Sequence, residues 1–456
     1  MEPVQPGYGR SRMPVRRVDW LAIAQLVVSA LGLGVFLLFS LMFFVMGIMA
    51  LVRRDMPVQL GVTSVFSLAW VSVLLSVLAL VSVIYAIREI NGKDRSASSG
   101  FWGSKWFLVA SGLLMLVPLV LLAGNAVAKQ GRIAWLLLPP LQLLVVVLPL
   151  WWMVESARRR LPRNSPQRTW GMLTFSLLIT SQVIVVVEIV GIVLAGIIVV
   201  VILAMQPGAA SELERLATRL MNSQMDPEIL VRVMRPFMQQ PWVIFGILAL
   251  GAGVVPLVEE LLKPLGLWAL LGRKLTPAEG FVMGAVCGAG FALLESLGNL
   301  SGPLTDGWLG LAAGRIGTGM LHVTCSAMVG WGMASAWHEG NYLRLGGTYA
   351  LAVLLHGIWN VFGLLMGIVP ILQGNSLLLR LGQAAPYALA GLGVVLLAIL
   401  LALNYSIRKA ALHAALVPAE AAAAVIPALS IEPTEQTEPV GAPDSLENLD
   451  KPVDKV

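Results

Sequence analysis

The feature that most constrains the fold of this chain is a series of apolar runs, each long enough to cross a lipid bilayer. They fall near residues 20–51, 60–87, 104–124, 133–154, 170–205, 241–272, 277–299, 308–337, 346–369 and 384–404. A helix needs about 20 mainly apolar residues to span the hydrocarbon core, and it satisfies its backbone hydrogen bonds internally. The runs therefore predict an all-α fold, a polytopic transmembrane helical bundle of about ten spans.

The composition agrees with a membrane protein. Of the 456 residues, 57% are hydrophobic and 12% are charged, whereas a soluble domain has about 25% charged residues. The two cysteines, Cys287 and Cys325, lie in apolar runs and predict neither a disulfide framework nor a thiolate metal site. The basic N-terminus precedes a run far longer than the about 7–15-residue core of a signal peptide, so we expect a retained first span.

The distribution of basic residues predicts the topology. Lysines and arginines collect at the N-terminus, in the 88–105 and 155–169 loops, at Arg273-Lys274, at Arg344 and at Arg408-Lys409. With ten spans these positions share one side, so both termini are expected in the cytoplasm. If 241–272 formed a helical hairpin instead of one span, every later span would have the opposite orientation and the C-terminus would lie outside. The expected location is a bacterial plasma membrane, as an integral, multi-pass protein.

Four short polar clusters lie in successive apolar runs of the second half of the chain. Within each cluster the polar residues are three or four apart and share a helix face. Charge inside a membrane costs about 2.5–3.5 kcal/mol per residue and is usually retained for function. Glutamates and histidines that arrive from separate helices are the ligand and base types of a metal-hydrolase site. The clusters are Glu259-Glu260-Leu261-Leu262-Lys263, Phe291 to Glu295, His322 to Ser326 and His356 to Asn360.

The first cluster has readable local chemistry. Glu259 lies four residues before Lys263 and Glu260 three before it, so either carboxylate can pair with the ammonium. Adjacent residues diverge by about 100° on a helix, which predicts different roles for the two glutamates. Pro256 and Pro264 each remove a backbone amide, so this helix is expected to bend and to line a cavity.

The positions of three further charged residues, Glu295, Glu188 and Arg315, bear on this interpretation. In straight helices Glu260 would lie near the cytoplasmic end of its run and Glu295 near the outer end of the next, so a shared site needs a kink or a tilt. Glu188 is interpreted as a protonated or paired packing residue. Arg315, near an outer helix end, can extend to the membrane surface and needs no functional role.

The four clusters resemble the motifs of the PrsW family of intramembrane metalloproteases, which is distantly similar to CAAX-prenyl-protease and bacteriocin-processing membrane proteins. The resemblance covers roughly residues 240–370, and no His-Glu-x-x-His run is present. The matches to a Glu-Glu-x-x-Lys box, a Phe-x-x-x-Glu box and two histidine boxes are Glu259, Glu260 and Lys263; Phe291 and Glu295; His322 with Ser326; and His356 with Asn360.

The resemblance implies hydrolysis of peptide bonds within or beside the membrane. In one version Glu295, His322 and His356 hold a divalent metal, expected to be zinc, while Glu259 or Glu260 activates water. In the other version no metal is used: a glutamate is the general base, and His356 and Asn360 stabilise the oxyanion. The catalytic set then comprises Glu259, Glu260, Lys263 and Asn360. The implied partners are a membrane-protein or membrane-tethered peptide substrate and the lipid bilayer, with no nucleic acid.

Two other functions remain open at this stage. Intramembrane glutamate, histidine and lysine on broken helices also occur in proton- or ion-coupled transporters, although no internal repeat is visible. A non-catalytic protein could use the same polar residues to bind a membrane partner.

The expected domains are N-terminal accessory helices at 1–205, an amphipathic extramembrane connector at 206–240, catalytic transmembrane helices at 241–405, and a disordered acidic tail at 406–456.

Overall fold

A computed structural model describes most of the chain. The described residues are 19–53, 61–92, 101–162, 165–205, 240–273, 275–302, 307–369 and 376–429, with a few isolated residues between 206 and 239. All regular structure in these ranges is helical, which confirms the predicted fold class. The expected connector at 206–240 lies almost wholly outside the described residues.

The first half of the chain contributes eight helical elements. They are α1 (Trp20–Val52), α2 (Val62–Ile90), α3 (Phe101–Leu114), α4 (Val117–Ala128), α5 (Ala134–Ala157), α6 (Pro166–Phe175), the π-helical turn η1 (Ser176–Thr180) and α7 (Ser181–Ala204).

The second half also contributes eight elements. They are α10 (Pro241–Ala249), the π-helical turn η2 (Leu250–Val254), α11 (Val255–Leu262), α12 (Leu265–Trp268), α13 (Pro277–Leu300), α14 (Trp308–Glu339), α15 (Tyr342–Ile368) and α16 (Ser376–Leu429).

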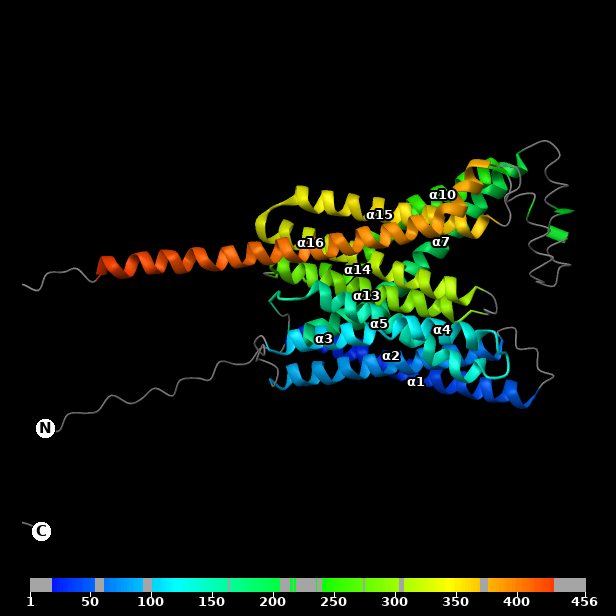
Figure 1. Cartoon of the computed structure of the whole chain (residues 1–456), viewed down its shortest axis with the longest axis horizontal. Coiled ribbons are helices and arrows are strands. Elements are labelled where there is room, and N and C mark those ends of the chain that lie inside the picture. The colour runs from blue at the N-terminus through cyan, green and yellow to red at the C-terminus, as the bar shows by residue number, and fades with distance from the viewer. Residues whose placement is uncertain are drawn as a thin grey trace, which may run out of the picture. The chain divides into compact units, whose positions relative to one another are not determined.

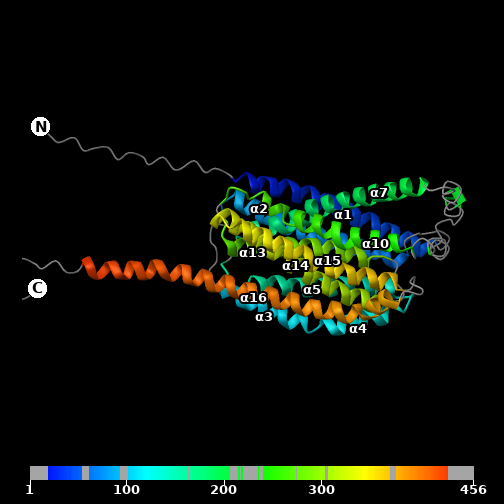
Figure 2. The same cartoon turned by 90° about the horizontal axis from the view of Figure 1, so that it is seen from above.

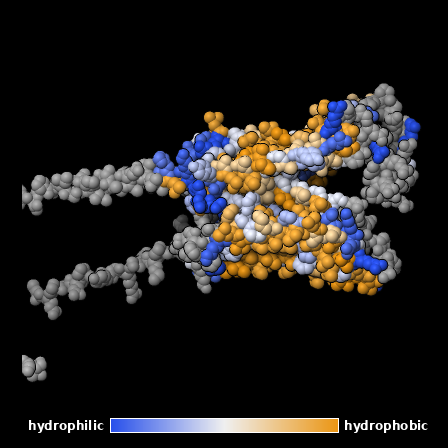
Figure 3. All heavy atoms as spheres, in the orientation of Figure 1, coloured by the Kyte–Doolittle hydropathy of each residue, from blue (hydrophilic) through white to orange (hydrophobic). Residues whose placement is uncertain are grey.

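Nine helical stretches of the described chain are long and apolar enough to cross a membrane. The protein is therefore an integral, multi-pass membrane protein, and its visible flank is largely apolar between two more polar ends (Figure 3). The one predicted span without a counterpart among these nine is 308–337, which corresponds to the long helix α14. It packs against α13, α15 and α5, and a helix enclosed by other helices does not need a continuous apolar surface.

Successive membrane helices run in alternate directions along the bundle (Figures 1 and 2). The start of α1 and the ends of α2, α5 and α14 consequently lie at the same end of the bundle, on the left in Figure 1. The loops rich in lysine and arginine follow these helix ends in the sequence. Four helix ends that border basic stretches of the sequence therefore share one end of the bundle.

The centre of the bundle is the antiparallel pair α13 and α14. Small residues let these two helices approach closely: a Cβ atom on Gly284 would lie 2.2 Å from the carbonyl oxygen of Ser326, and one on Gly288 would lie 2.2 Å from that of His322. Helix α5 packs against both, and the amide of Gln142 donates to the carbonyl of Leu300 at 2.7 Å. The accessory half of the chain therefore braces the helices that carry the polar clusters.

Contacts divide the chain into two units after Arg408. Helix α16 continues as far as Leu429, so residues 406–429 are helical where the sequence predicts the beginning of a disordered tail. The physical reason is the run of alanines between residues 410 and 428, because alanine has the highest helix propensity of the amino acids. Residues 430–456 lie outside the described residues.

Candidate active site

The helical stretch that carries Glu259 and Glu260 has two irregularities. In η2 the amide of Val255 donates to the carbonyl of Leu250, one residue further back than in an α-helix. After Lys263, Pro264 ends α11 and the short helix α12 follows. Leu270 and Leu275, which follow α12, are buried.

The ammonium group of Lys263 is the centre of the site, and the side chain is fully buried. Its Nζ lies 2.6 Å from Oε1 of Glu260 and 2.8 Å from Oε2 of Glu259. The predicted pairing at three and four residues is therefore confirmed for both carboxylates. The ammonium also lies 2.8 Å from Nδ1 of His322 and 4.8 Å from the centroid of the Phe291 ring. A cation between two carboxylates and an aromatic face is well compensated for its burial.

His322 joins this ammonium to Glu295. Because Lys263 can only donate, Nδ1 of His322 accepts, and Nε2 carries the proton that it donates to Oε2 of Glu295 at 2.8 Å. Glu295 lies about two turns beyond Gly288, the residue that meets the backbone of His322, but side chains lean toward the N-terminus of their own helix. In an antiparallel pair both side chains therefore lean toward each other, and His322 and Lys263 together link Glu295 to Glu260, the two residues that straight helices would hold apart.

Helix α15 brings His356 to the other side of the two glutamates. Nδ1 of His356 lies 2.8 Å from Oε1 of Glu260, and Nε2 lies 3.9 Å from Oε2 of Glu259. A protonated Nδ1 bound to a carboxylate leaves Nε2 with a free lone pair, the arrangement in which a carboxylate orients a ligand or base histidine. The imidazole rings of His322 and His356 have centroids 5.3 Å apart.

Helix α15 is held in register by the irregular backbone of its neighbour. Nδ2 of Asn360 donates to the carbonyl of Gly251 in η2 at 2.8 Å, and the hydroxyl of Tyr349 donates to the carbonyl of Leu257 at 2.8 Å. At Gly357 a Cβ atom would lie 2.5 Å from the carbonyl oxygen of Ala252, so only glycine allows this approach. The π-helical turn and α15 together determine where His356 lies.

The result is a compact group of ligand-type atoms. One atom each from Glu259, Glu260, His322 and His356 lies within 4.8 Å of all the others, and all four residues are buried. They come from α11, α14 and α15, three separate stretches of the second half of the chain.

Residues 181–403 match a family model described as PrsW family intramembrane metalloprotease. Across these residues the chain belongs to the PrsW family. Neither the curated proteins nor the solved structures yielded a match to it. The PrsW match begins at the first residue of α7, ahead of the domain boundary expected near 241, and it includes the whole buried group.

In this PrsW family protein the structure joins six of the predicted site residues in one network: Glu259, Glu260, Lys263, Glu295, His322 and His356. Asn360 lies beside them, bonded to the backbone of η2. Ser326 is fully buried, and its hydroxyl has no hydrogen-bond partner among the described residues. Glu295 lies outside the compact four-residue group and contacts only one of its members, His322.

The donor set of this PrsW site is suited to a divalent metal. Two carboxylates and two imidazoles are ordinary zinc ligands, and Oε2 of Glu260 is buried without a hydrogen-bond partner among the described residues. Three of the four residues are in contact with the ammonium of Lys263, which neutralises the carboxylates in the structure described here.

Two residues of the site are not found by reading the sequence alone. Arg315 does not extend to the membrane surface, since its Nη2 lies 2.6 Å from Oε2 of Glu295 and its Nε donates to the hydroxyl of Ser296. Glu188 of α7 interacts electrostatically with Glu259, and its Oε1 is buried without a hydrogen-bond partner among the described residues. Both had a signal: Arg315 is two turns from His322 on one helix face, and Glu188 is a charged residue within a span.

Proposed function

We propose that this protein hydrolyses a peptide bond of a membrane-spanning or membrane-tethered substrate at the Glu259, Glu260, His322 and His356 group. The observation that carries the proposal is the convergence of these four residues within 4.8 Å inside a helical bundle. Membership of the PrsW family supports a peptidase of this class. A buried site excludes bulk water, which strengthens the electrostatic stabilisation of a developing oxyanion.

The two glutamates have different surroundings, and we propose different roles for them. Glu260 is fully buried and is bonded to both Lys263 and His356, so it orients the histidine and the ammonium. Glu259 is 7% exposed, so its carboxylate is the better placed of the two to accept a proton from water. In the version without metal, the peptide carbonyl would develop its negative charge near Asn360 and near His356, which must carry a proton on both ring nitrogens to donate to it.

A divalent metal, expected to be zinc, fits the same residues. Oε2 of Glu260, Nε2 of His356 and, with the ammonium of Lys263 displaced, Nδ1 of His322 would hold it while Glu259 activates water, and the ion would supply Lewis-acid activation of the carbonyl and of water. In this proposal Glu295 and Arg315 orient His322 rather than bind the ion. Lys263 compensates the carboxylates when they hold no other cation.

The remaining helices are proposed to support this site. Helices α1 to α6 form an accessory scaffold, because α5 packs against α13 and α14 and η1 is tied to α13 through the hydroxyl of Ser176 and the carbonyl of Cys287 at 2.7 Å. The end of the bundle with the basic loops is proposed to face the cytoplasm.

The test is cleavage of dye-labelled, single-span peptides reconstituted in vesicles with the purified protein, with fragments identified by mass spectrometry. We expect Glu259→Gln and Glu260→Gln each to lower the rate by at least about a hundredfold, the range lost with a general base. The matched control is Glu279→Gln, which keeps the capping box at the start of α13 far from the site. Undiminished cleavage by both single variants and by the double variant would refute the proposal.

The metal is tested separately. Chelation and metal analysis of the purified protein should show loss of cleavage together with loss of a stoichiometric ion. Full cleavage by a metal-stripped preparation would instead support the version in which a glutamate acts without metal.

A further inference from the structure

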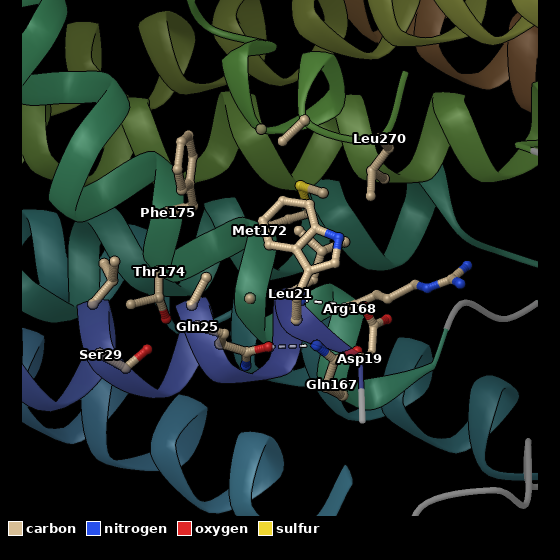
Figure 4. A pocket seen from close by; sticks show the side chains of 16 residues that line it. Asp19, Leu21, Gln25, Ser29, Gln167, Arg168, Met172, Thr174, Phe175 and Leu270 are labelled. Carbon is tan, nitrogen blue, oxygen red and sulfur yellow. Dashed lines mark hydrogen bonds between the residues drawn. The ribbon is translucent and has the colours of Figure 1, made fainter. Parts of the chain in front are cut away.

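A cavity of about 150 Å³ lies between α1, α6 and α12, separate from the Glu/His group (Figure 4). Its walls are mainly apolar and include Leu21, Val28, Met172, Phe175 and Leu270. An apolar cavity of about this volume can hold a benzene ring, so this one accommodates a short length of hydrocarbon. It lies at the end of the bundle where α1 begins, beside the exposed indole of Trp20. Tryptophans are enriched at the headgroup level of membranes, which places the mouth of the cavity near lipid headgroups.

One polar group in the wall has no partner. The hydroxyl of Thr174 makes no hydrogen bond with any residue that the structure describes, although Thr174 is 3% exposed. The amides nearby are satisfied: Gln167 donates to Gln25 at 2.6 Å, and Gln25 donates to the hydroxyl of Ser82 at 3.0 Å. A buried hydroxyl without a partner calls for an explanation, and an oxygen atom of a bound molecule would supply the acceptor.

The mouth of the cavity carries a net positive charge. Both terminal nitrogens of Arg273 donate to the carboxylate of Asp19, at 3.0 and 2.9 Å. This pairing lowers the pKa of Asp19, so the carboxylate stays charged and neutralises Arg273. Arg168 lies close enough to Asp19 to interact with it electrostatically, and its side chain extends outward past Asp19 (Figure 4). Among the described residues no partner forms an ion pair with the guanidinium of Arg168.

We propose that this cavity binds one acyl chain of an anionic phospholipid, with the phosphate on Arg168 and an ester oxygen on the hydroxyl of Thr174. Arg168 and Thr174 both line the cavity and are six residues apart on α6, so the hydroxyl lies about 9 Å further along the helix than the arginine at the mouth. The apolar walls take the first part of the chain. The rest of the chain lies along the lipid-facing surface of α1.

The lipid would also contact the end of the stretch that carries the site. One wall of the cavity consists of Gly266 in α12 and of Ala269 and Leu270 directly after it. These residues follow Lys263 by three to seven positions. A Cβ atom on Gly266 would lie 2.8 Å from the sulfur of Met172, so α12 and α6 are already in close contact. A bound chain would hold α12, and with it Lys263, in the position seen here. This consequence rests on the proposed function, whereas lipid binding itself does not.

The experiment measures lipid retained by the purified full-length protein after incorporation into nanodiscs of phosphatidylglycerol or phosphatidylcholine, with native mass spectrometry as the readout. We expect retained phosphatidylglycerol in excess of phosphatidylcholine, and no displacement by inorganic phosphate. Ala269→Phe fills the cavity and should lower retention by at least about tenfold, the effect of losing about 1.4 kcal/mol of binding. Ala123→Phe, an exposed alanine on α4, is the matched control and should retain lipid normally.

Variants at two further residues keep the proposal testable if the phenylalanine variant does not fold. Arg168→Gln should abolish the preference for the anionic lipid, while Arg168→Lys keeps it. Thr174→Val should fold normally, since it removes a hydroxyl with no partner in the described structure, and should lower retention. Equal retention of both lipids by the wild-type protein, or normal retention by Ala269→Phe and Arg168→Gln, would overturn the proposal. Because no cleavage is measured, an inactive protein would not affect this outcome.

Discussion

Replacing Gly288 with alanine tests whether the close packing of α13 on α14 sets the geometry of the site. The new methyl carbon would lie 2.2 Å from the carbonyl oxygen of His322, whereas real Cβ contacts are essentially never below 3.0 Å, so the helices must separate by at least 0.8 Å. If His322 moves away from α13 by that amount, its 2.8 Å contact to Glu295 on that helix lengthens to as much as about 3.6 Å. That distance is beyond hydrogen-bond range.

The expected cost follows from these distances. Overpacking of a closely packed interior destabilises by about 1–3 kcal/mol, and the better helix propensity of alanine offsets at most about 1 kcal/mol of it. A displacement of about 1 Å in a catalytic group can lower the rate by about a hundredfold. We therefore expect a large loss of cleavage with a moderate loss of stability.

The assay pairs thermal unfolding in detergent with cleavage of single-span peptides in vesicles. Gly298→Ala is the control on the same helix, since nothing lies within 4 Å of a Cβ atom there, and it should be neutral or slightly stabilising. Equal stability and cleavage for the two variants would show that the close approach is not required. Loss of stability with normal cleavage would remove His322 from the catalytic network.

Three further predictions concern charged groups. Lys263→Met leaves two buried carboxylates without their cation and should destabilise by about 3–5 kcal/mol in thermal unfolding, with partial restoration by added zinc; an unchanged melting temperature would contradict the network. Arg315→Gln should lower the rate of cleavage, and Arg315→Lys should restore part of it, because the arginine holds Glu295 against His322; equal rates would exclude a positioning role. Arg273 lowers the pKa of Asp19. Their partly exposed ion pair therefore stabilises the fold by about 0.2–1 kcal/mol above about pH 4, and this contribution is lost as the pH falls further. The difference in melting temperature between wild type and Asp19→Asn should accordingly shrink between pH 6 and pH 3.

The multi-span helical fold and the polar network in its second half could both be predicted from local patterns. Apolar runs of 20 or more residues leave a helix as the only way to satisfy the backbone in lipid, so the sequence predicts the class of fold. The pairs between Lys263 and the two glutamates are equally local, because helical spacing alone brings residues three and four apart together. The motifs that resemble the PrsW family are likewise visible as residue types in order.

Other features depend on contacts between distant segments, and only the tertiary structure decides them. Arg315 lies 20 residues from Glu295 in the sequence, and the two meet because small residues let α13 and α14 pack closely and side chains on antiparallel helices lean toward each other. The carbonyl of Gly251 in the π-helical turn η2 accepts a hydrogen bond from the amide of Asn360, which lies on a helix more than a hundred residues later.

What the sequence by itself determined is therefore which residues must leave the lipid and which neighbours along a helix they pair with. Membrane burial imposes these requirements on each helix separately, through the cost of charge and of unpaired backbone groups. The tertiary structure decided that Lys263, rather than either histidine, is the central group of the site. Three helices converge there, and among the residues that the structure describes the ammonium is the one cation that reaches Glu259, Glu260 and His322 together.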